Sequence, residues 1–452
     1  MSTVSLVWLR DDLRIADNPA LHAAAEHGPV VVLYVLDEES DGIRPLGGAS
    51  KWWLHNSLES LGADLAAAGV ALVLRRGAAA AIVEKVAQDV GATAVFWNRR
   101  YGAPEIAVDT AVKTALRDRG LEVSSFAASL LFEPWTVRTG SNTPYSVYTP
   151  FWRACRAAPE PRHPLPAPKL SGADADSGDD LQSWMLLPTT PDWAGGLRDE
   201  WTPGEQGGAE RLAEFIHDDV DDYADGRDEL SGRVTSRLSP HLRFGEVSPY
   251  QAWHAAATSK GKGAAGFMSE LGWREFAAHV LFHFPDLATQ NWRAKFDGFP
   301  WNPVDENALK AWQQGRTGIA VVDAGMRELW QTGTMHNRVR MITASFLTKN
   351  LLMDWRLGEQ WFWDTLVDAD GASNPFNWQW VAGSGADAAP YFRVFNPELQ
   401  AKKFDPQGRY VRQWAPEHLT GDAPEPIVDL GESRKAALNA YAAIKDVVPP
   451  QH

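Results

Sequence analysis

The first 130 residues alternate short apolar runs with longer segments of helical character. The apolar runs are rich in Val, Leu and aromatic residues, which favours strands. Segments such as 50–68 and 104–119 are rich in Ala, Leu and charged residues, which favours helices. Such alternation is typical of a doubly wound parallel sheet. We therefore predict an α/β, Rossmann-like domain with strands at 4–9, 29–36, 71–75, 93–97 and 121–126.

Ligands of such sheets bind beyond the carboxyl ends of the strands. Those ends carry the polar segments 10–14, 37–39 and 98–101. Neither a GxGxxG fingerprint nor a Walker-type GxxxxGKS or GxxxxGKT loop follows the first strand. The two common phosphate-binding loops of α/β domains are therefore absent from this position.

After the α/β pattern, the composition changes twice. Residues 159–180 are rich in proline and small acidic residues, which indicates a connector on the surface. Trp184, Trp193 and Trp201 are expected to dock parts of this connector onto a domain. From about 209 onward, helical periodicity dominates. We predict an α/β domain at 1–130, a connector at 131–208 and an all-helical domain at 209–452.

The expected helices of the last region include two with distinct start signals. Ser239-Pro240 and Ser248-Pro249 each combine a capping serine with a proline at the first helical position. These signals predict that a helix begins at each pair. The other helices are expected at 209–219, 264–283, 318–332 and 335–351, with a last one at about 432–445.

Composition excludes several classes of protein. No apolar run reaches the ~18–20 residues of a membrane span, and the N-terminus has no signal-peptide pattern. The single cysteine, Cys155, forbids an internal disulfide, excludes a cysteine-bound iron–sulfur cluster and fits a reducing cytosol. The net charge of −15 argues on its own against a nucleic-acid partner, although a local basic cleft can bind phosphate on an acidic protein. We expect a cytoplasmic protein without a membrane partner, and no metal site is predicted.

One stretch, 368–397, concentrates residues that suit a flat ligand with a polar edge. Its glycines and amides allow close approach of the backbone, while its carboxylates and arginine can fix the polar edge. Trp378 and Trp380 stand two residues apart, which is rare in a surface loop because so much apolar area favours burial. This stretch is predicted to line a cofactor pocket.

Three further stretches carry polar side chains at helical spacing. In TSRLSP (235–240), the hydroxyls and the free amides of a helix start suit a diphosphate, although a plain capping box would use the same residues. Glu270, Trp273 and Arg274 share one helical face, as an ordinary ion-pair surface with one core tryptophan also would. In the third stretch, Asn337, Arg338 and Met341 are expected to line one side of a helix while Arg340 points elsewhere, and His336 is expected to be structural.

Taken together, five segments resemble the DNA photolyase/cryptochrome family in order and spacing. Within that family the chain is most similar to cyclobutane pyrimidine dimer (CPD) photolyases of the bacterial class I/III type. The resemblance implies an α/β antenna-binding domain followed by an all-helical domain that binds FAD in a U shape. The segments are WLRDDLRIADNPAL (8–21), TSRLSP (235–240), SELGWREF (269–276), TGTMHNRVRM (332–341) and LVDADGASNPFNWQW…PYFR (366–393).

The resemblance also assigns residues to the cofactor. Asn374 matches the residue that faces flavin N5, and a neutral amide there favours the reduced anionic flavin as the active form. Arg340 is the expected ion-pair partner of Asp368. Trp378, Trp355 and Trp301 match an electron-hopping chain to the surface, whereas Trp361 and Trp363 have no such match and are expected to be core. The implied FAD-binding residues are Tyr223, Thr235, Ser236, Arg237, Leu238, Ser239, Arg274, Asn337, Arg340, Asp368, Ala369, Asp370 and Asn374.

On the DNA side, the resemblance implies that the pyrimidine dimer is flipped out of the stack into a pocket with aromatic walls. Glu270 is the expected catalytic group that hydrogen-bonds the pyrimidines. Photolyases for (6-4) products carry two histidines where this chain has Asn337 and Met341, so CPD repair is the expected activity. The implied DNA and lesion contacts are Arg227, Glu270, Trp273, Asn337, Arg338, Met341, Trp380 and Gln400.

A second, light-harvesting chromophore is implied near residues 98–105. Glu105 keeps an acid found in folate binders, while Pro104 departs from their usual Asn, and Arg100 replaces the Asp of deazaflavin binders. Methenyltetrahydrofolate is the expected antenna, with a deazaflavin or no antenna as alternatives.

Two other functions compete with CPD repair. A cryptochrome-like blue-light photoreceptor predicts a long, low-complexity C-terminal tail, whereas only VVPPQH follows the last expected helix here. A generic flavoprotein oxidoreductase lacks support because no hydride-donor or nicotinamide motif is present. We therefore expect a carbon–carbon lyase that acts on UV-damaged DNA as a monomer in the bacterial cytosol or nucleoid, with no obligatory protein partner.

Overall fold

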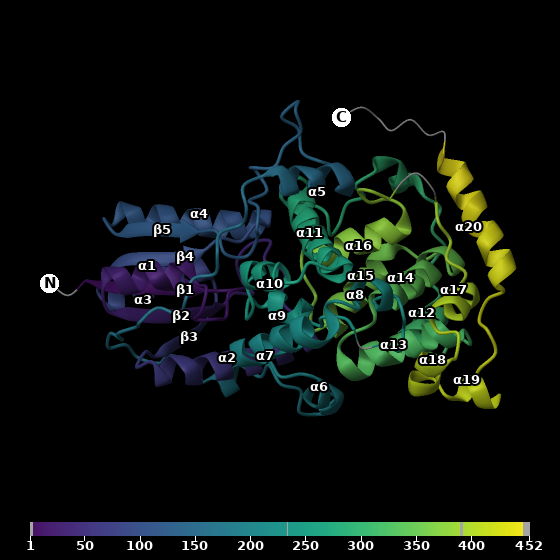
Figure 1. Cartoon of the computed structure of the whole chain (residues 1–452), viewed down its shortest axis with the longest axis horizontal. Helices are drawn as coiled ribbons and strands as arrows, with labels where there is room; N and C mark the ends of the chain where they lie inside the picture. The colour runs from purple at the N-terminus through teal and green to yellow at the C-terminus, as the bar shows by residue number, and fades with distance from the viewer. Residues whose placement is uncertain (1–2, 233, 389–391, 446–452) are drawn as a thin grey trace.

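Two domains lie side by side in the computed structural model, which describes residues 3–232, 234–388 and 392–445 (Figure 1). The α/β domain occupies one end and the helical domain the other, with α20 (Leu430–Lys445) along the far edge of the helical domain. This arrangement confirms the predicted fold class. The first two residues of the PYFR segment and the C-terminal VVPPQH lie outside the described residues.

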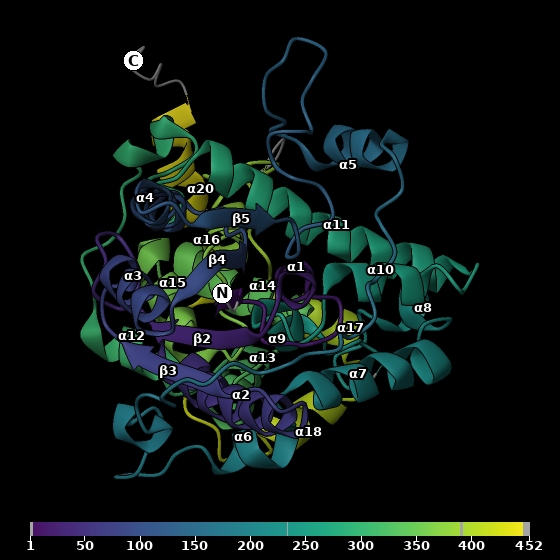
Figure 2. The same ribbon diagram turned by 90° about the vertical axis from the view of Figure 1, so that its left-hand side faces the viewer.

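Five parallel strands form the sheet, in the order β3-β2-β1-β4-β5. Alternate side chains enter two separate cores, because Val7 and Leu9 pack with α1 and α2 while Leu6 and Trp8 pack with α3 and α4. Figure 2 shows β5 with α4 at one edge of this domain and β3 with α2 at the other. Each strand agrees with its prediction to within one residue. The elements are β1 (Val4–Leu9), α1 (Pro19–His27), β2 (Val30–Leu36), α2 (Gly48–Ala67), β3 (Leu72–Arg76), α3 (Ala79–Asp89), β4 (Ala92–Asn98), α4 (Ala103–Asp118) and β5 (Glu122–Phe126).

The connector packs against both domains. Its residue Gly178 forms a parallel bridge with Leu74 of the edge strand β3, so the connector covers part of that edge. Trp184 is buried against Tyr34 of the sheet, and Trp201 donates from Nε1 to the carbonyl of Thr332 at 2.7 Å. Trp193 is half-buried and packs against the core of the α/β domain, so the predicted docking is confirmed for all three tryptophans. Its short helices are α5 (Tyr148–Ala157), η1 (Leu181–Trp184) and α6 (Gly195–Glu200).

Helices build the remainder of the chain, and no strand follows β5 among the described residues. None of the helices in the described part is long and apolar enough to cross a membrane. The helices are α7 (Glu205–Glu214), η2 (Phe215–Asp219), α8 (Tyr223–Gly226), α9 (Ser239–Arg243), α10 (Pro249–Ala256), α11 (Lys262–His283), η3 (Ala294–Gly298), α12 (Glu306–Gln313), α13 (Ala320–Thr332), α14 (Asn337–Ser345), η4 (Phe346–Asn350), α15 (Trp355–Thr365), α16 (Ser373–Ala382), α17 (Pro397–Phe404), α18 (Arg409–Trp414) and α19 (Glu417–Thr420), before α20.

The two predicted helix starts differ in outcome. Ser248 caps α10, since its hydroxyl accepts from the Gln251 amide at 2.9 Å and the Gln251 side chain accepts from the Ser248 amide in return. Ser239, in contrast, is itself the first residue of α9 and makes no capping hydrogen bond. The predicted serine cap is therefore wrong at Ser239, although the predicted helix start is present, and within the described residues its hydroxyl has no hydrogen-bond partner.

The two domains meet through polar contacts that fix their separation. Arg14 donates to the Gly245 carbonyl at 2.7 Å, and Trp53 donates to Glu246 at 2.9 Å. Gly245 has a φ of +68°, and a Cβ there would lie 2.2 Å from the carbonyl oxygen of Asp11. Only glycine therefore allows this close approach of the domains.

Candidate active site

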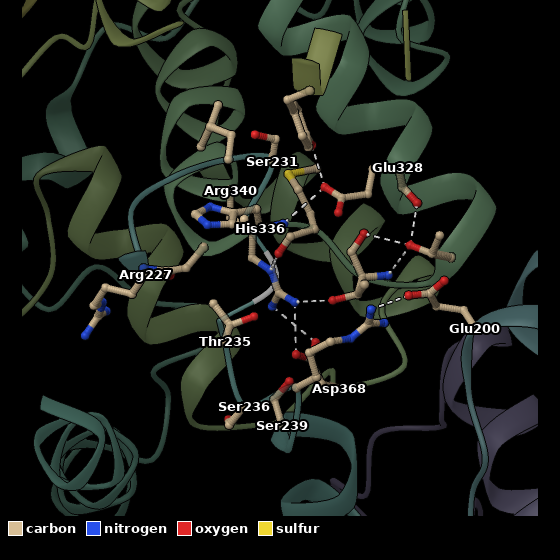
Figure 3. Close-up of a pocket in the computed structure, with 18 of the residues that line it drawn as sticks. Glu200, Arg227, Ser231, Thr235, Ser236, Ser239, Glu328, His336, Arg340 and Asp368 are labelled. Carbon is tan, nitrogen blue, oxygen red and sulfur yellow. Dashed lines mark hydrogen bonds and ion pairs between the residues drawn. The ribbon is translucent and has the colours of Figure 1, made fainter. Parts of the chain in front are cut away.

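Two adjoining cavities of about 340 and 450 Å³ lie in the helical domain. They share lining residues, including Tyr223, Ser239, Arg340 and Asp368, so these side chains stand between or beside both cavities. The smaller cavity is shown in Figure 3. All four of the stretches singled out from the sequence contribute side chains to these cavities. They lie in or next to four separate helices, α9, α11, α14 and α16, which the fold brings together.

Hydroxyl-bearing residues line the smaller cavity at one side. Thr235, Ser236 and Ser239 gather near Asp368 in Figure 3. Arg237 also lines this cavity, but its guanidinium pairs with Glu200, and its Nη2 is buried without a partner among the described residues. Hydroxyl donors and a guanidinium with an unused donor suit a diphosphate.

The Arg340–Asp368 ion pair implied by the resemblance is present, with contacts of 2.9 and 3.1 Å. Arg340 is also held by the Met335 carbonyl at 2.8 Å and lines both cavities. The expectation that Arg340 points away is wrong, because it follows Asn337 by three residues and shares its helical face. Arg338 is instead the residue that turns aside, and it pairs with Asp228 at 2.7 Å.

Asn374 lines the larger cavity near the start of α16. Its amide nitrogen donates to the backbone carbonyl of Glu359 at 3.0 Å and to the Glu359 carboxylate at 2.9 Å. Asp370 accepts from the amides of Ala372 and Ser373 at 2.9 and 2.6 Å, which fixes the first turn of α16. The position of Asn374 is thus determined by its own helix and by α15.

The predicted tryptophan chain lies in one hydrophobic core. Trp378 lines the cavity and Trp355 is fully buried, whereas Trp301 is partly exposed. The Trp378 ring packs directly on Gly358, one turn after Trp355, where a Cβ would lie 2.0 Å from the ring. Next to Trp301, the Asn302 amide donates to the Leu352 carbonyl at 2.8 Å, just before α15. The three residues therefore share one core and differ in exposure, from the cavity wall at Trp378 to partly exposed Trp301.

Trp361 and Trp363 lie at the edge of the helical-domain core and pack against it, so the expectation that they are core residues is confirmed in part. Both are half-buried on the outer side of α15. Trp361 stacks on the exposed Trp330 with ring centroids 6.1 Å apart, and Trp363 lies under the Arg44 guanidinium at 4.0 Å. One side of each ring thus meets a partner at the surface, while the rest packs against the core.

On the other side of the cavity, Glu270, Trp273 and Arg274 line the wall from α11, as their shared helical face predicted. Tyr148 stacks on one face of Trp273, with centroids 3.7 Å apart and planes 10° from parallel. Only the opposite face of Trp273 is then available to a ligand. Glu270 forms a close ion pair with Arg227.

The remaining predicted lesion contacts divide into two groups. Asn337, Met341 and Trp380 line the cavity together with Trp273. Arg338 and Gln400 line neither of the two cavities, and Arg338 lies 4.6 Å from the ring of Phe404 on the same helix as Gln400. Any contact of these two residues with a ligand would therefore be made outside the cavity.

Burial shifts the pKa of several groups in the walls. It raises the pKa of Tyr223 above its ordinary value, so the phenol stays a hydrogen-bond donor. It lowers the pKa of His336 to about 4, so this imidazole is neutral at pH 7. His336 Nδ1 accepts from the Arg338 amide at 3.2 Å and caps α14, which confirms the expected structural role.

Sequence reasoning missed four residues at or near the cavity. Arg243 lines it and pairs with Asp11 of the α/β domain at 2.6 Å, while Glu328 accepts from Tyr410 at the far end of the smaller cavity. Arg243 and Asp11 are 232 residues apart in sequence, so no local pattern could link them. Tyr148 and Glu359 were missed for the same reason.

In the α/β domain, the implied antenna residue Glu105 lies in the first turn of α4. Its carboxylate lies against Gly102, where a Cβ would be 2.1 Å from Oε2. At the nearby carboxyl ends of β1 and β4, Asn98 donates to Asp12 at 2.7 Å and Arg10 to Asp109 at 3.0 Å. These side chains are buried and contact one another.

Comparisons with known proteins agree with this geometry. Family models match residues 5–169 as DNA photolyase and residues 267–423 as the FAD binding domain of DNA photolyase. The deoxyribodipyrimidine photo-lyase of Agrobacterium fabrum is 50% identical, and the match covers 97% of this chain and 98% of that protein. Cryptochrome-1 of Arabidopsis thaliana is 37% identical over 94% of this chain and 66% of its own length.

A solved structure of a photolyase has the same fold as this chain. The crystal structure of a bacterial class III photolyase from Agrobacterium tumefaciens superposes with a TM-score of 0.94 at 49% identity, covering 99% of this chain and 98% of that one. Class III is one of the two bacterial classes that the sequence resemblance indicated. The acids, amides, hydroxyls and tryptophans of the cavity fit an FAD, and the chain belongs to the DNA photolyase family.

Proposed function

We propose that the protein repairs cyclobutane pyrimidine dimers in UV-damaged DNA, in a light-driven reaction that uses reduced anionic FAD. One observation carries this proposal: α16 presents Asn374, Trp378 and Trp380 to a single cavity. Groups that suit a flavin and groups that suit a flipped base therefore share one space. The 50% identity to a protein named deoxyribodipyrimidine photo-lyase supports the same activity.

The residues of the smaller cavity would hold the cofactor by its charged and polar groups. Thr235, Ser236 and Ser239, which line this cavity, would donate to the diphosphate, and their neighbour Arg237 would add positive charge. Arg340, fixed by Asp368, would donate to the polar edge of the flavin. When bound, reduced FAD supplies an electron to the dimer on excitation and takes it back after the ring opens. Tyr223, Leu238, Arg274, Asn337, Ala369 and Asp370 complete the proposed binding set.

Trp273 and Trp380 would stack on the flipped pyrimidines. Stacking on an aromatic side chain contributes roughly 1–3 kcal/mol per base, which offsets the few kcal/mol that flipping costs. Tyr148 behind Trp273 keeps that ring in a fixed plane. Glu270 would hydrogen-bond the pyrimidine edge, and its partner Arg227 supplies the positive charge that stabilises an electron-rich carbonyl.

Trp378, Trp355 and Trp301 would return electrons to oxidised FAD. Indole can be oxidised transiently by an excited flavin, and a series of rings would divide one long transfer into shorter steps. The support for this role is that Trp378 lines the cavity, Trp355 is buried and Trp301 reaches solvent. Trp355 Nε1 donates to Asn291 at 2.9 Å, which holds the middle ring.

Outside the cavity, Arg338 and Gln400 would contact the DNA backbone. We also propose methenyltetrahydrofolate as the antenna, held near Glu105 in the first turn of α4. A deazaflavin or an empty antenna site are the alternative outcomes, and the absorption spectrum of purified protein with its extracted chromophores distinguishes all three. The protein is proposed to act as a monomer in the bacterial cytosol or nucleoid without an obligatory protein partner.

Blue-light repair of an oligonucleotide with one thymine dimer tests the main proposal. FAD-loaded protein is reduced, mixed with the substrate and illuminated, and restored thymines are measured by chromatography. Repair that requires light is the expected result, with Trp273→Ala and Trp380→Ala each weakening binding of damaged DNA. Full FAD occupancy without any repair would overturn the enzyme proposal and favour a cryptochrome-like photoreceptor.

A further inference from the structure

The amide of Asn374 is fixed in one orientation by its two hydrogen bonds. Both partners belong to Glu359: the backbone carbonyl at 3.0 Å and carboxylate Oε1 at 2.9 Å. Both are acceptors, so the nitrogen of Asn374 must face them and both of its hydrogens are used. The polar atom that remains for the cavity is the carbonyl oxygen, which can only accept.

Glu359 is held in turn by an arginine of the α/β domain. Arg44 contacts both carboxylate oxygens, Nη1 to Oε1 at 2.7 Å and Nη2 to Oε2 at 2.9 Å. The Glu359 side chain is 2% exposed, whereas that of Arg44 is 34% exposed. A bidentate guanidinium pair fixes the plane of the carboxylate as well as its position. Oε1 is therefore held in position to accept the hydrogen bond from the Asn374 side chain.

The loop that carries Arg44 is itself fastened to α15. Trp363 donates from Nε1 to the Pro45 carbonyl at 2.9 Å, and the Gly48 amide donates to Asp364 at 2.8 Å. A Cβ on Gly47 would lie 2.1 Å from the Trp363 carbonyl, so the loop and the helix are in direct backbone contact. The Arg44 guanidinium also lies 4.0 Å above the Trp363 ring.

We propose that Arg44 is a positioning residue for the flavin site: through Glu359, the α/β domain fixes which atom of Asn374 faces the cofactor. This inference rests on the proposed placement of flavin N5 beside Asn374. An acceptor at that point matches the N5–H of reduced flavin and repels the N5 lone pair of oxidised flavin. The contact between the domains therefore favours the reduced cofactor that repair requires.

Loss of Arg44 removes this selection without removing a cofactor contact. The carboxylate of Glu359 then lacks its charged partner in a buried position, which favours its displacement or protonation. A protonated or displaced Glu359 no longer holds the side-chain nitrogen of Asn374 toward itself. The amide can rotate and offer a donor to oxidised N5, so the preference for reduced flavin decreases.

Another arginine of this chain offers a matched control. Arg162 pairs with the fully buried Asp17 of the α/β domain, and its own side chain is 31% exposed. Its guanidinium lies 4.0 Å above the ring of Tyr250, as that of Arg44 does above Trp363. The two ion pairs thus share burial and aromatic support, but Arg162 contacts no residue that we place at the flavin.

The experiment compares Arg44→Gln, Arg44→Lys, Glu359→Gln and Arg162→Gln in FAD-loaded protein. The midpoint reduction potential of the flavin, its rate of re-oxidation by air in the dark and the melting temperature are measured for each. Arg44→Gln and Glu359→Gln should lower the potential and speed re-oxidation about fivefold, the factor that one ordinary hydrogen bond supplies. Arg44→Lys should give a smaller effect, because lysine contacts a carboxylate as a point charge. Arg162→Gln should lower only the melting temperature.

Two results would overturn the inference. One is an unchanged potential and re-oxidation rate in Arg44→Gln and Glu359→Gln at full FAD occupancy. The other is an equal change in Arg162→Gln, which would reduce Arg44 to a general stabiliser of the domain contact. Repair is assayed separately, so loss of repair in the unmodified protein would contradict the proposed function while the potentials still decide on Arg44.

Discussion

At the carboxyl ends of β1 and β4, charged side chains contact one another, whereas around the helical-domain cavity they face open volume. Arg10, Asp12 and Asn98 are buried and hydrogen-bonded within the α/β domain. Arg340 and Asp368 also pair, yet both line the cavity. At these strand ends, the α/β domain uses the three polar side chains for its own stability, while the helical domain presents its charged pair to the cavity. Mutations in the two regions should therefore affect different measurements.

The largest difference between the two regions is expected when one buried tryptophan in each is replaced and FAD photoreduction is measured. Trp355→Phe should almost abolish photoreduction of oxidised FAD under steady light with a thiol reductant, because phenylalanine is much harder to oxidise than indole. Repair by chemically pre-reduced enzyme should be retained. Trp97→Phe is the counterpart in the α/β domain, since Trp97 is equally buried. Normal photoreduction in Trp355→Phe would remove Trp355 from the electron path.

An aspartate in each region gives the next largest contrast. Asp368→Ala leaves Arg340 without its carboxylate and should weaken FAD binding by about 3 kcal/mol, or roughly 100-fold. Asp12→Ala should instead lower the free energy of unfolding by about 3 kcal/mol, because the Asn98 amide and the Arg10 backbone lose a buried acceptor. Titration of apoprotein with FAD and denaturant unfolding separate the two effects. Equal FAD affinity in Asp368→Ala and the unmodified protein would contradict the assignment.

A buried acid between the regions adds a pH dependence. Glu275 accepts from the Phe132 amide of the connector at 3.0 Å, and burial raises the pKa of its carboxyl to about 7. Because the folded state then holds a proton that the unfolded state has lost, Glu275 lowers stability progressively as pH rises from about 4.5 to 7. Glu275→Gln should therefore be more stable than the unmodified protein at pH 8, by up to about 3 kcal/mol, and similar near pH 4.5. Thermal unfolding across this range measures the difference, and a constant offset at all pH values would contradict it.

Whether a structural feature could be predicted from the sequence depends on how far apart in the chain the contacting residues lie. The strands, the Ser248 cap and the shared face of Glu270, Trp273 and Arg274 follow from periodicity and neighbouring residues, and the structure contains all of them. Helical spacing also predicts the direction of Arg340, because residues three apart share a helical face and Asn337 precedes Arg340 by three residues. The expectation that Arg340 points elsewhere did not apply this rule.

Contacts between segments that are far apart in the sequence leave no local pattern from which they could be predicted. Arg44 and Glu359 are 315 residues apart, and neither lies in a motif shared with the family segments quoted above. Trp361 and Trp363 were expected in the core because they match no position of the electron-hopping chain, and the structure places them at the edge of that core. Their contacts with Trp330 and Arg44 at the surface depend on how α15 meets α13 and the α/β domain, which periodicity does not describe.

The smallest expected effect concerns the outer rim of the cavity. Arg338 pairs with Asp228, which is 42% exposed, so DNA phosphate can compete for the guanidinium. Arg338→Ala should weaken binding of damaged DNA and reduce the slope of log affinity against log salt by about one unit, because one phosphate contact is lost. Lys435→Ala is the matched control, since Lys435 forms an exposed pair on α20 at the far edge of the helical domain (Figure 1). Fluorescence anisotropy at several salt concentrations gives both slopes. If Arg338→Ala and Lys435→Ala share the slope of the unmodified protein, the rim of the cavity at Arg338 does not meet phosphate, and the DNA-binding surface must begin closer to Arg227.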